Sequence, residues 1–201
     1  VMAPGTNTSQ RPYTEASTVD ITVGDTAIQQ VSNFTYLGSI ISSDGTIDRD
    51  LSARIQKASG AFNQLGNIWK NRNIQTNTKI RIYVAAVLTI LLYGSEVWNT
   101  TSKQLHRFEV FHQNCLRRIL RIKWFHRTSN VQVSERARIN PVITYISANR
   151  LRWFGHVSRM PDTRLPKYLI DWTPAHGRRL AKLAKFYLRI IHSKLFNPLG
   201  Y

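Results

Sequence analysis

Aspartate side chains are the first candidates for chemistry in this chain, because paired carboxylates can hold the divalent cations that drive phosphoryl transfer. Asp44, Asp48 and Asp50 lie close together in the first half of the sequence. Asp44 stands before a glycine in a predicted turn, and the other two stand where a helix is expected to begin. Turn formation and helix capping account for all three side chains. The sequence therefore predicts no catalytic residue and no metal site in this chain.

His112 and Cys115 are a second candidate, since a spacing of three residues on a helix can place two metal ligands on one face. The next possible ligand, His126, is eleven residues further along. Both side chains fall on the apolar stripe of their predicted helix, which favours buried packing over a metal site or a Cys–His nucleophile. Cys115 is also the only cysteine. This excludes an intramolecular disulfide and fits a reducing, intracellular compartment.

Basic side chains give a stronger signal, because the net charge of +17 is concentrated in the second half of the chain. Residues 101–201 contain 20 Lys and Arg against 4 Asp and Glu, whereas residues 1–100 contain 8 against 7. Such one-sided charge destabilises a compact chain by self-repulsion unless a polyanion neutralises it. Arginine suits phosphate recognition, so nucleic acid is the favoured partner. An acidic membrane surface, a ribosome-like assembly and a damaged coding sequence are the alternatives.

The basic residues expected to contact nucleic acid occur on three predicted helices. Those at the end of the third helix also suit its negative C-terminal dipole, so helix stabilisation is an alternative for them. Those of the fourth helix alternate with Trp153, Phe154 and His156, which gives either a stacking platform for unpaired bases or core aromatics with a basic edge. The candidates are Lys79, Arg81, Arg117, Arg118, Arg121, Lys123, Arg150, Arg152 and Arg159.

The elements that must position these residues follow from the hydrophobic pattern. Residues 19–23 and 27–31 alternate like strands, and residues 34–42 form a further strand that ends at a Ser-Asp-Gly turn. From residue 48 onward, apolar side chains recur every three or four positions, which is typical of amphipathic helices. The expected fold class is mainly α, with a small N-terminal antiparallel β-hairpin followed by a helical bundle and a basic helical tail. Helices are predicted over residues 48–69, 76–93, 102–122 and 141–160, with a short segment at 168–172 and a basic amphipathic stretch at 180–195.

The first two predicted helices should lie antiparallel and pack along one apolar stripe. Polar residues at the helix starts are the expected caps: Thr76 or Asn77 for the second helix and Ser102 for the third. Trp69 and Trp98 are both assigned to the core. The stripe consists of Leu51, Ile55, Phe62, Leu65 and Trp69.

One glycine interrupts the apolar strand at residues 34–42, within Tyr36-Leu37-Gly38-Ser39. A glycine inside a strand indicates a place where another backbone comes close. Backbone amides beside Gly38 can bond a phosphate oxygen, and Tyr36 can pack against a sugar. The alternative is an ordinary hairpin with a glycine bulge.

Taken in order, these motifs resemble the reverse transcriptases of non-LTR (LINE-like) retrotransposons, in the region that follows their catalytic palm motifs. The resemblance covers residues 20–179. Phe34-x-Tyr36-Leu37-Gly38-Ser39 is similar to the primer-grip hairpin of that family. Four segments resemble the thumb of that family: Ala53-Arg54-Ile55, Phe62-x-x-Leu65, Lys79-x-Arg81-Ile82-Tyr83 and Leu91-Leu92-Tyr93-Gly94-Ser95-Glu96-x-Trp98. Two more resemble the segments that follow the thumb: Phe111-His112-x-x-Cys115-Leu116-Arg117-Arg118-Ile119-Leu120 and Leu151-Arg152-Trp153-Phe154-Gly155-His156-Val157-x-Arg159-Met160.

The resemblance implies three regions: the end of the palm with a primer-grip-like hairpin at residues 1–46, a helical thumb-like bundle at 47–124, and a basic C-terminal helical region at 125–201. Their implied function is to grip an RNA–DNA primer–template duplex. The metal-binding aspartates of that family lie in an aromatic-x-Asp-Asp motif, which this chain lacks and which would precede Val1. The parent would be an Mg²⁺-dependent RNA-directed DNA polymerase, whereas this fragment, with no cofactor of its own, should be inactive alone.

The implied partners are therefore RNA and DNA, and the implied location is cytoplasmic and nuclear. The longest apolar run, residues 83–94, is too short to cross a bilayer, so no membrane is expected. A different class of function stays open, namely a non-enzymatic nucleic-acid-binding or architectural protein derived from a retroelement. An untranslated or decayed copy without a selected function is the third possibility. Residues 180–201 depart from the usual continuation of the family, which a frameshift or local divergence would explain.

Overall fold

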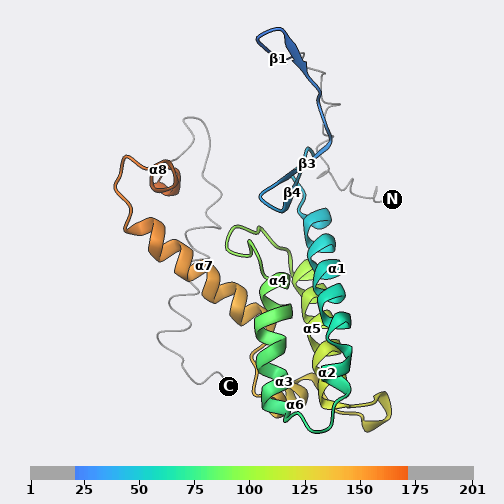
Figure 1. Cartoon of the computed structure of the whole chain (residues 1–201). Helices are drawn as coiled ribbons and strands as arrows, with labels where there is room; N and C mark the ends of the chain where they lie inside the picture. Colours follow the sequence, from blue (N-terminus) through green and yellow to red (C-terminus); the bar gives the residue numbers. More distant parts are fainter. Residues whose placement is uncertain (1–20, 172–201) are drawn as a thin grey trace, which may run out of the picture. The chain divides into compact units, whose positions relative to one another are not determined.

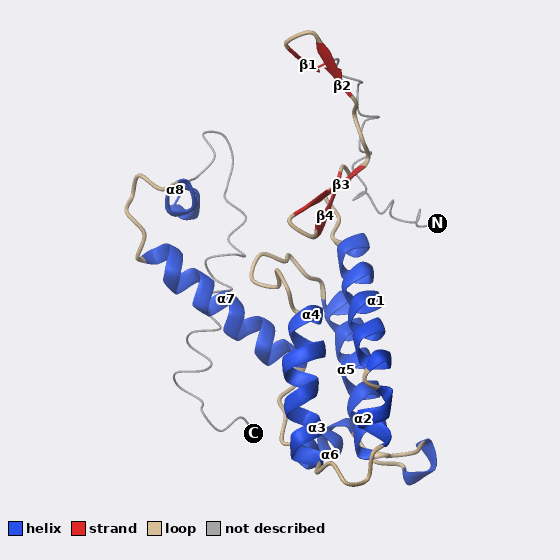
Figure 2. Ribbon diagram, in the orientation of Figure 1, coloured by secondary structure: helices blue, strands red, loops and turns tan. Residues whose placement is uncertain are grey.

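A computed structural model describes residues 21–171 and confirms the expected fold class (Figure 1). The described chain is mainly helical, with small antiparallel hairpins at its start (Figure 2). It divides into two compact units, Val1–Asp50 and Leu51–Tyr201, and each is treated by itself below. The predicted stretch at 180–195 and the outer ends of the segments at 19–23 and 168–172 lie outside the described residues.

Two antiparallel β-hairpins and the start of the first helix make up the described part of the first unit. Many of its apolar side chains are exposed, so backbone ladders rather than a core give it its form. Asp50 Oδ1 accepts a hydrogen bond of 3.0 Å from Ile40 N, which ties the last strand to the helix that follows. The strands are β1 (Ile21–Val23), β2 (Thr26–Ile28), β3 (Asn33–Tyr36) and β4 (Ser39–Ser42).

The chain reverses direction at Leu37-Gly38, so the expectation of one continuous strand over residues 34–42 is wrong. Tyr36 pairs with Ser39 across a two-residue turn. Both turn residues have positive φ, 48° at Leu37 and 83° at Gly38. Two successive positive φ values match a type I′ turn, whose twist suits the right-handed twist of the paired strands. The glycine lies at the tip of a hairpin rather than inside a strand.

The second unit is a helical bundle that contains the larger part of the first helix. Its central helix, α5 (Ser102–Leu120), contacts helices that precede and follow it in the chain. Within residues 21–171 no helix is both long enough and apolar enough to span a bilayer. The other helical segments are α1 (Asp48–Gln64), α2 (Gly66–Lys70), α3 (Thr76–Tyr83), η1 (Val84–Leu88), α4 (Thr89–Leu91), η2 (Trp124–His126), α6 (Asn130–Ala137), α7 (Val142–Ser158) and α8 (Leu165–Asp171).

Aromatic side chains organise the core of the bundle. Phe62 stacks on Trp69 with 5.0 Å between ring centroids and meets the edge of Tyr83 at 6.3 Å. Trp98 stacks on Phe108 at 5.1 Å. All five side chains are buried, which confirms the assignment of the two tryptophans to the core.

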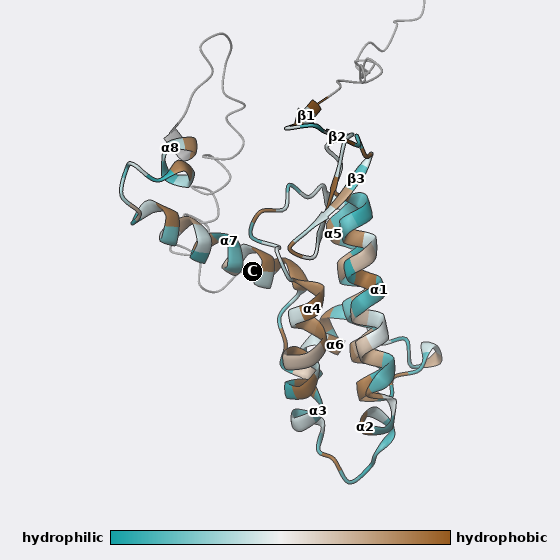
Figure 3. Cartoon of the chain, turned by 45° about the horizontal axis from the view of Figure 1, so that its top comes forward, coloured by the Kyte–Doolittle hydropathy of each residue, from teal (hydrophilic) through white to brown (hydrophobic). Residues whose placement is uncertain are grey.

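The segment formed by α3, η1 and α4 is apolar over much of its length (Figure 3). A π-helical turn at η1 interrupts the α-helical pattern that the sequence predicts for residues 76–93. Thr89 Oγ1 donates to Ala85 O at 2.7 Å, a back-bond that satisfies the hydroxyl beside this turn. The side chains that this segment buries include Ile80, Tyr83, Val87, Leu88 and Leu91.

Helix starts differ from the predicted ones where a neighbouring residue makes the better cap. Thr101 caps α5 in place of Ser102: Thr101 Oγ1 accepts from Gln104 N at 3.3 Å, and Gln104 Oε1 accepts from Thr101 N at 2.8 Å. This reciprocal capping box satisfies two backbone donors at once. Gln75 precedes α3 without a side-chain cap bond, so the side-chain cap expected for the second helix is wrong.

Candidate nucleic-acid interface

A groove of about 860 Å³ lies beside α2 and the C-terminal half of α5. Its lining contains six cationic side chains and no acidic one, so the local potential is positive. We call it the basic groove. Its cations are Lys70, Arg72, Arg117, Arg118, Arg121 and Lys123.

The end of α5 supplies three of these cations, all of them expected from the sequence. Arg117 and Arg118 lie in the last turn, and Arg121 is the C-cap with a left-handed φ of 58°. Positive charge at this position stabilises the negative end of the helix dipole. The arginines therefore stabilise the helix end and also line the groove, so these two roles are compatible.

Hydrogen bonds to backbone carbonyls hold two of these arginines, Arg117 and Arg121, in place. Arg117 Nη2 donates to Thr128 O at 2.9 Å and to Asn130 Oδ1 at 2.8 Å. Arg121 Nη2 donates to Lys70 O at 2.6 Å, which links the end of α5 to the end of α2. A guanidinium group carries more N–H donors than these bonds use. Both side chains can therefore be fixed in position and still donate to a phosphate.

Arg118 connects the groove to the core. Its Cζ lies 4.8 Å from the centroid of the Phe62 ring, within the range of a cation–π contact. Its Nη1 donates to Asn63 Oδ1 at 3.3 Å. The position of this groove cation thus depends on a buried aromatic ring beneath it.

Lys79 has a structural role in place of the expected nucleic-acid contact. Its side chain is only 4% exposed. The Nζ atom donates to Trp69 O at 3.1 Å and to Asn71 O at 2.5 Å, carbonyls at the end of α2. Burial lowers the pKa of the ammonium group, and the nearby Arg121 charge lowers it further. The side chain is therefore committed to closing the turn between α2 and α3.

Arg150 is a second candidate that the fold takes into its interior. It is 4% exposed, and its Nη2 donates to Trp98 O at 2.6 Å and to Thr100 Oγ1 at 3.0 Å. These bonds anchor the loop between α4 and α5 on α7. Arg81, by contrast, is exposed on α3 and lies outside the lining of the basic groove.

Arg152 and Arg159 meet Trp153 and His156 at a second hollow, of about 500 Å³, on α7. The tryptophan and histidine rings lie 5.7 Å apart at an angle of 41°. Glu96 lines the same hollow, so its charge is less uniform than that of the basic groove. The aromatic and basic side chains of this helix do come together, with the tryptophan partly exposed.

The β3–β4 turn presents apolar side chains to solvent. Leu37, at its tip, is 74% exposed, and Tyr36 and Phe34 are also exposed with their rings 6.4 Å apart. The positive φ of Gly38 gives a local reason for glycine at that position. The left-handed φ of Leu37 is unfavourable by about 1–2 kcal/mol. A strained, exposed leucine is therefore the unusual feature of this hairpin.

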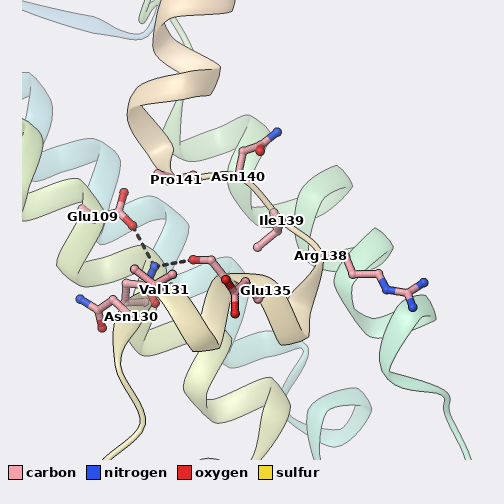
Figure 4. A pocket seen from close by; sticks show the side chains of 10 residues that line it. Glu109, Asn130, Val131, Glu135, Arg138, Ile139, Asn140 and Pro141 are labelled. Atoms are coloured by element: carbon pink, nitrogen blue, oxygen red, sulfur yellow. Dashed lines mark hydrogen bonds between the residues drawn. The ribbon is translucent and has the colours of Figure 1, made fainter. Parts of the chain in front are cut away.

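A third hollow, of about 430 Å³, lies between α5 and α6 (Figure 4). Gln113 Nε2 donates to Glu109 Oε1 at 2.9 Å and to Ser134 Oγ at 3.0 Å. Val142 N donates to Glu109 Oε2 at 2.9 Å, which anchors the start of α7. Glu109 and Glu135 both line this hollow, so it suits a phosphate less than the basic groove does.

His112 and Cys115 are both buried, which confirms their packing role. Burial raises the pKa of the Cys115 thiol to about 12, far from the range of a reactive thiolate. His112 Nδ1 and Tyr83 Oη share a hydrogen bond of 2.8 Å. Burial lowers the pKa of His112, while the Glu109 charge and the backbone of Asn140 act in the opposite direction.

The buried imidazole predicts a loss of stability in mild acid. Histidine in an unfolded chain has a pKa of about 6.5, above that of folded His112, so the unfolded state binds more protons below that pH. The Tm of the wild type should therefore fall as the pH is lowered from about 7.5 to about 5.5, and it should fall less in His112→Gln. His106→Gln, which makes the same substitution at an exposed position of α5, is the matched control. An equal fall in wild type and His112→Gln would contradict the prediction.

Comparison with known proteins relates the chain to a sequence of transposon origin. Residues 61–93, from the end of α1 to just beyond α4, match a domain of unknown function, DUF6451. The chain is 28% identical over 163 residues to a transposon-derived protein of Caenorhabditis elegans that is itself uncharacterised. The match covers 77% of this chain and 56% of that protein, so the chain spans little more than half the length of the relative. No solved structure matches the chain.

Proposed function

We propose that this chain is the primer-grip, thumb and downstream part of a non-LTR retrotransposon reverse transcriptase, and that it holds the RNA–DNA primer–template duplex. The observation that carries the proposal is the basic groove, which gathers six cationic side chains with no acid among them. The resemblance of the sequence motifs to that family and the similarity to a transposon-derived protein support it. The chain spans 56% of the length of that relative. Polymerase activity is therefore proposed for a longer parent protein, and duplex binding is proposed for this chain.

The groove suits a phosphate backbone better than base edges. Lysine and arginine bind phosphate oxygens without reading sequence, and each neutralised phosphate releases counterions. A polymerase must hold every sequence that it copies, so contacts of this kind fit the role. Arginines held by hydrogen bonds, as Arg117 and Arg121 are, also lose little conformational freedom when a ligand binds.

Hydrogen bonds within the chain account for two of the three aspartates that were considered as metal ligands. Asp44 Oδ1 accepts from both Thr46 N and Thr46 Oγ1 at 2.9 Å, bonds that lower its pKa. Asp50 Oδ1 accepts from Ile40 N. Across residues 21–171, no group of three or more His, Cys, Asp or Glu side chains is placed to hold a metal ion. In this proposal Mg²⁺ chemistry belongs to aspartates that precede Val1 in the parent polymerase, and this chain positions the nucleic acid.

The test is the salt dependence of duplex binding. The affinity of the full chain for a labelled RNA–DNA duplex, measured by fluorescence anisotropy, should fall log-linearly with NaCl concentration. The double variant Lys70→Gln/Arg72→Gln should reduce the slope by about two, because each lost phosphate contact removes roughly one released counterion. These two residues are chosen because both are exposed in the groove, so their substitution should leave the core intact.

The control removes the same charge elsewhere. Lys57→Gln/Lys103→Gln changes exposed residues of α1 and α5 that do not line the groove, and it should leave most of the slope intact. Equal losses in the two double variants would assign binding to overall charge rather than to the groove. Binding that does not weaken between low and moderate salt would overturn the proposed function.

A further inference from the structure

A loop joins α5 to α6 (Figure 1). It contains Trp124, which is the most exposed large apolar side chain in the described part of the chain. Its exposed fraction is 89%, and the adjoining Phe125 is 58% exposed. Tryptophan is on average highly buried, so this degree of exposure in a folded region calls for an explanation. We call Trp124, Phe125 and His126 the aromatic tip.

The aromatic tip is a defined structure. Its rings meet edge to face, with centroids 5.8 Å apart for Trp124 and Phe125 and 4.6 Å apart for Phe125 and His126. Lys123 N donates to His126 Nδ1 at 3.1 Å, which closes a single 3₁₀ turn. The loop is therefore shaped to hold the indole outward.

Residues in the left-handed conformation stand on both sides of the tip, Arg121 before it at φ 58° and Arg127 directly after it at φ 47°. This conformation is rare for residues with a Cβ atom and persists where the surroundings impose it. Arg117, whose side chain lines the basic groove, also bonds the carbonyl of Thr128 at the far end of the loop. Arg117 therefore lines the groove and also holds the loop that carries the tip.

The charge around the tip matches the charge of the groove. Lys123 lines the groove and directly precedes Trp124, and Arg127 directly follows the tip. Residues 121–129 contain no Asp or Glu. A strand whose phosphates lie in the groove would therefore meet an exposed aromatic face at the Lys123 end, without crossing an acidic side chain.

We propose that the aromatic tip stacks on unpaired bases of the nucleic acid whose backbone lies in the basic groove. Aromatic side chains next to cationic grooves bind single strands in this way, because every base offers a π-face and the cations hold the backbone. This inference rests on the proposed function and adds a preference to it. The groove holds phosphates of any duplex, while the tip selects places where bases are unpaired.

The experiment compares labelled single-stranded and blunt duplex oligonucleotides, with the full chain, at one fixed salt concentration. Trp124→Ala should weaken binding of the single strand about tenfold and binding of the blunt duplex less than about twofold. Trp124→Phe, which keeps an aromatic face, should retain most of the affinity, whereas Trp124→Leu should not. Tyr168→Ala, which removes an exposed aromatic ring from α8, should bind both oligonucleotides like the wild type.

A direct readout of stacking is the quenching of tryptophan fluorescence by an unlabelled single strand. Quenching should be larger in the wild type than in Trp124→Phe, which shares every other tryptophan. Single-strand affinities within about twofold between wild type and Trp124→Ala would overturn the stacking role, while salt-dependent duplex binding would leave the proposed function standing. A Trp124→Ala protein that binds nucleic acid normally but loses self-association would assign the tip to a protein contact instead. Absence of any nucleic-acid binding by the wild type at low salt would overturn both.

Discussion

Phe62→Ala should lower the free energy of unfolding of the helical bundle by about 3–5 kcal/mol. Phe62 is buried, stacks on Trp69 at 5.0 Å and meets the edge of Tyr83 at 6.3 Å. Its backbone carbonyl also accepts from Trp69 Nε1 at 2.7 Å, so the surrounding structure is held in place. Side chains held in this way cannot move fully into the space that the ring leaves, so a cavity remains and adds to the cost.

Chemical denaturation of the full chain measures this change. Val131→Ala, at an exposed apolar position of α6, is the control and should change stability by no more than about 0.5 kcal/mol. Phe62→Leu separates volume from aromaticity: it should cost less than the alanine variant but still remove the ring beneath Arg118. Duplex affinity should then fall in Phe62→Leu through the displaced arginine. Equal stability of Phe62→Ala and Val131→Ala would show that the Phe62 stripe is not the core.

Periodicity predicts this core because the period of a helix is a local property. The side chains of Leu51, Phe62 and Trp69 are buried as the pattern indicates, whereas Ile55 and Leu65 are half-buried. The helix α1 ends at Gln64 and α2 begins at Gly66, so the stripe does not lie on one continuous helix. Such a break depends on how the short α2 docks on α5, a contact between segments far apart in sequence. Periodicity within one segment does not contain that information.

Helix α6 could have been predicted from the sequence. Ser129 Oγ accepts from Gln132 N at 3.3 Å and Gln132 Oε1 accepts from Ser129 N at 3.0 Å, the geometry of a capping box. The pattern Ser-x-x-Gln that encodes it is visible in the sequence. The helix is short, so hydrophobic periodicity gives a weak signal there and the cap is the better indicator.

The candidate interface divides the basic residues in a way that composition does not predict. Arg117, Arg118 and Arg121 are recognisable because they cluster at one helix end. Lys70 and Arg72 join them only through the fold, since they come from the end of α2 and the turn after it. Lys79 and Arg150 are buried instead, because backbone carbonyls that lack helical partners accept from them. Tertiary contacts therefore decide whether a cationic side chain faces solvent, lines the groove or donates to a backbone carbonyl.

Leu37→Asn should stabilise the β3–β4 hairpin and at the same time impair the proposed primer grip. Asparagine followed by Gly38 is the preferred pair for a type I′ turn, and it relieves the strain of a leucine at φ 48°. The variant also removes the exposed apolar tip. In a polymerase that contains the upstream aspartates, primer extension should fall on the order of 100-fold, because a misplacement of the reacting hydroxyl by about 1 Å costs that much.

Leu37→Asn is expected to raise the stability of the hairpin and to lower primer extension. A substitution at Leu37 therefore tests the primer grip better than one at Gly38. A valine at Gly38 would be strained by its φ of 83° whatever the hairpin binds, so lost activity could not be assigned to a lost contact. Asp25→Asn, in the turn of the β1–β2 hairpin, is the matched control and should extend primers at the normal rate. Slower amide exchange across β3 and β4 would report the gain in stability of Leu37→Asn. If the variant has a more stable hairpin and extends primers normally, Leu37 does not contribute to gripping nucleic acid. The turn would then have only a structural role.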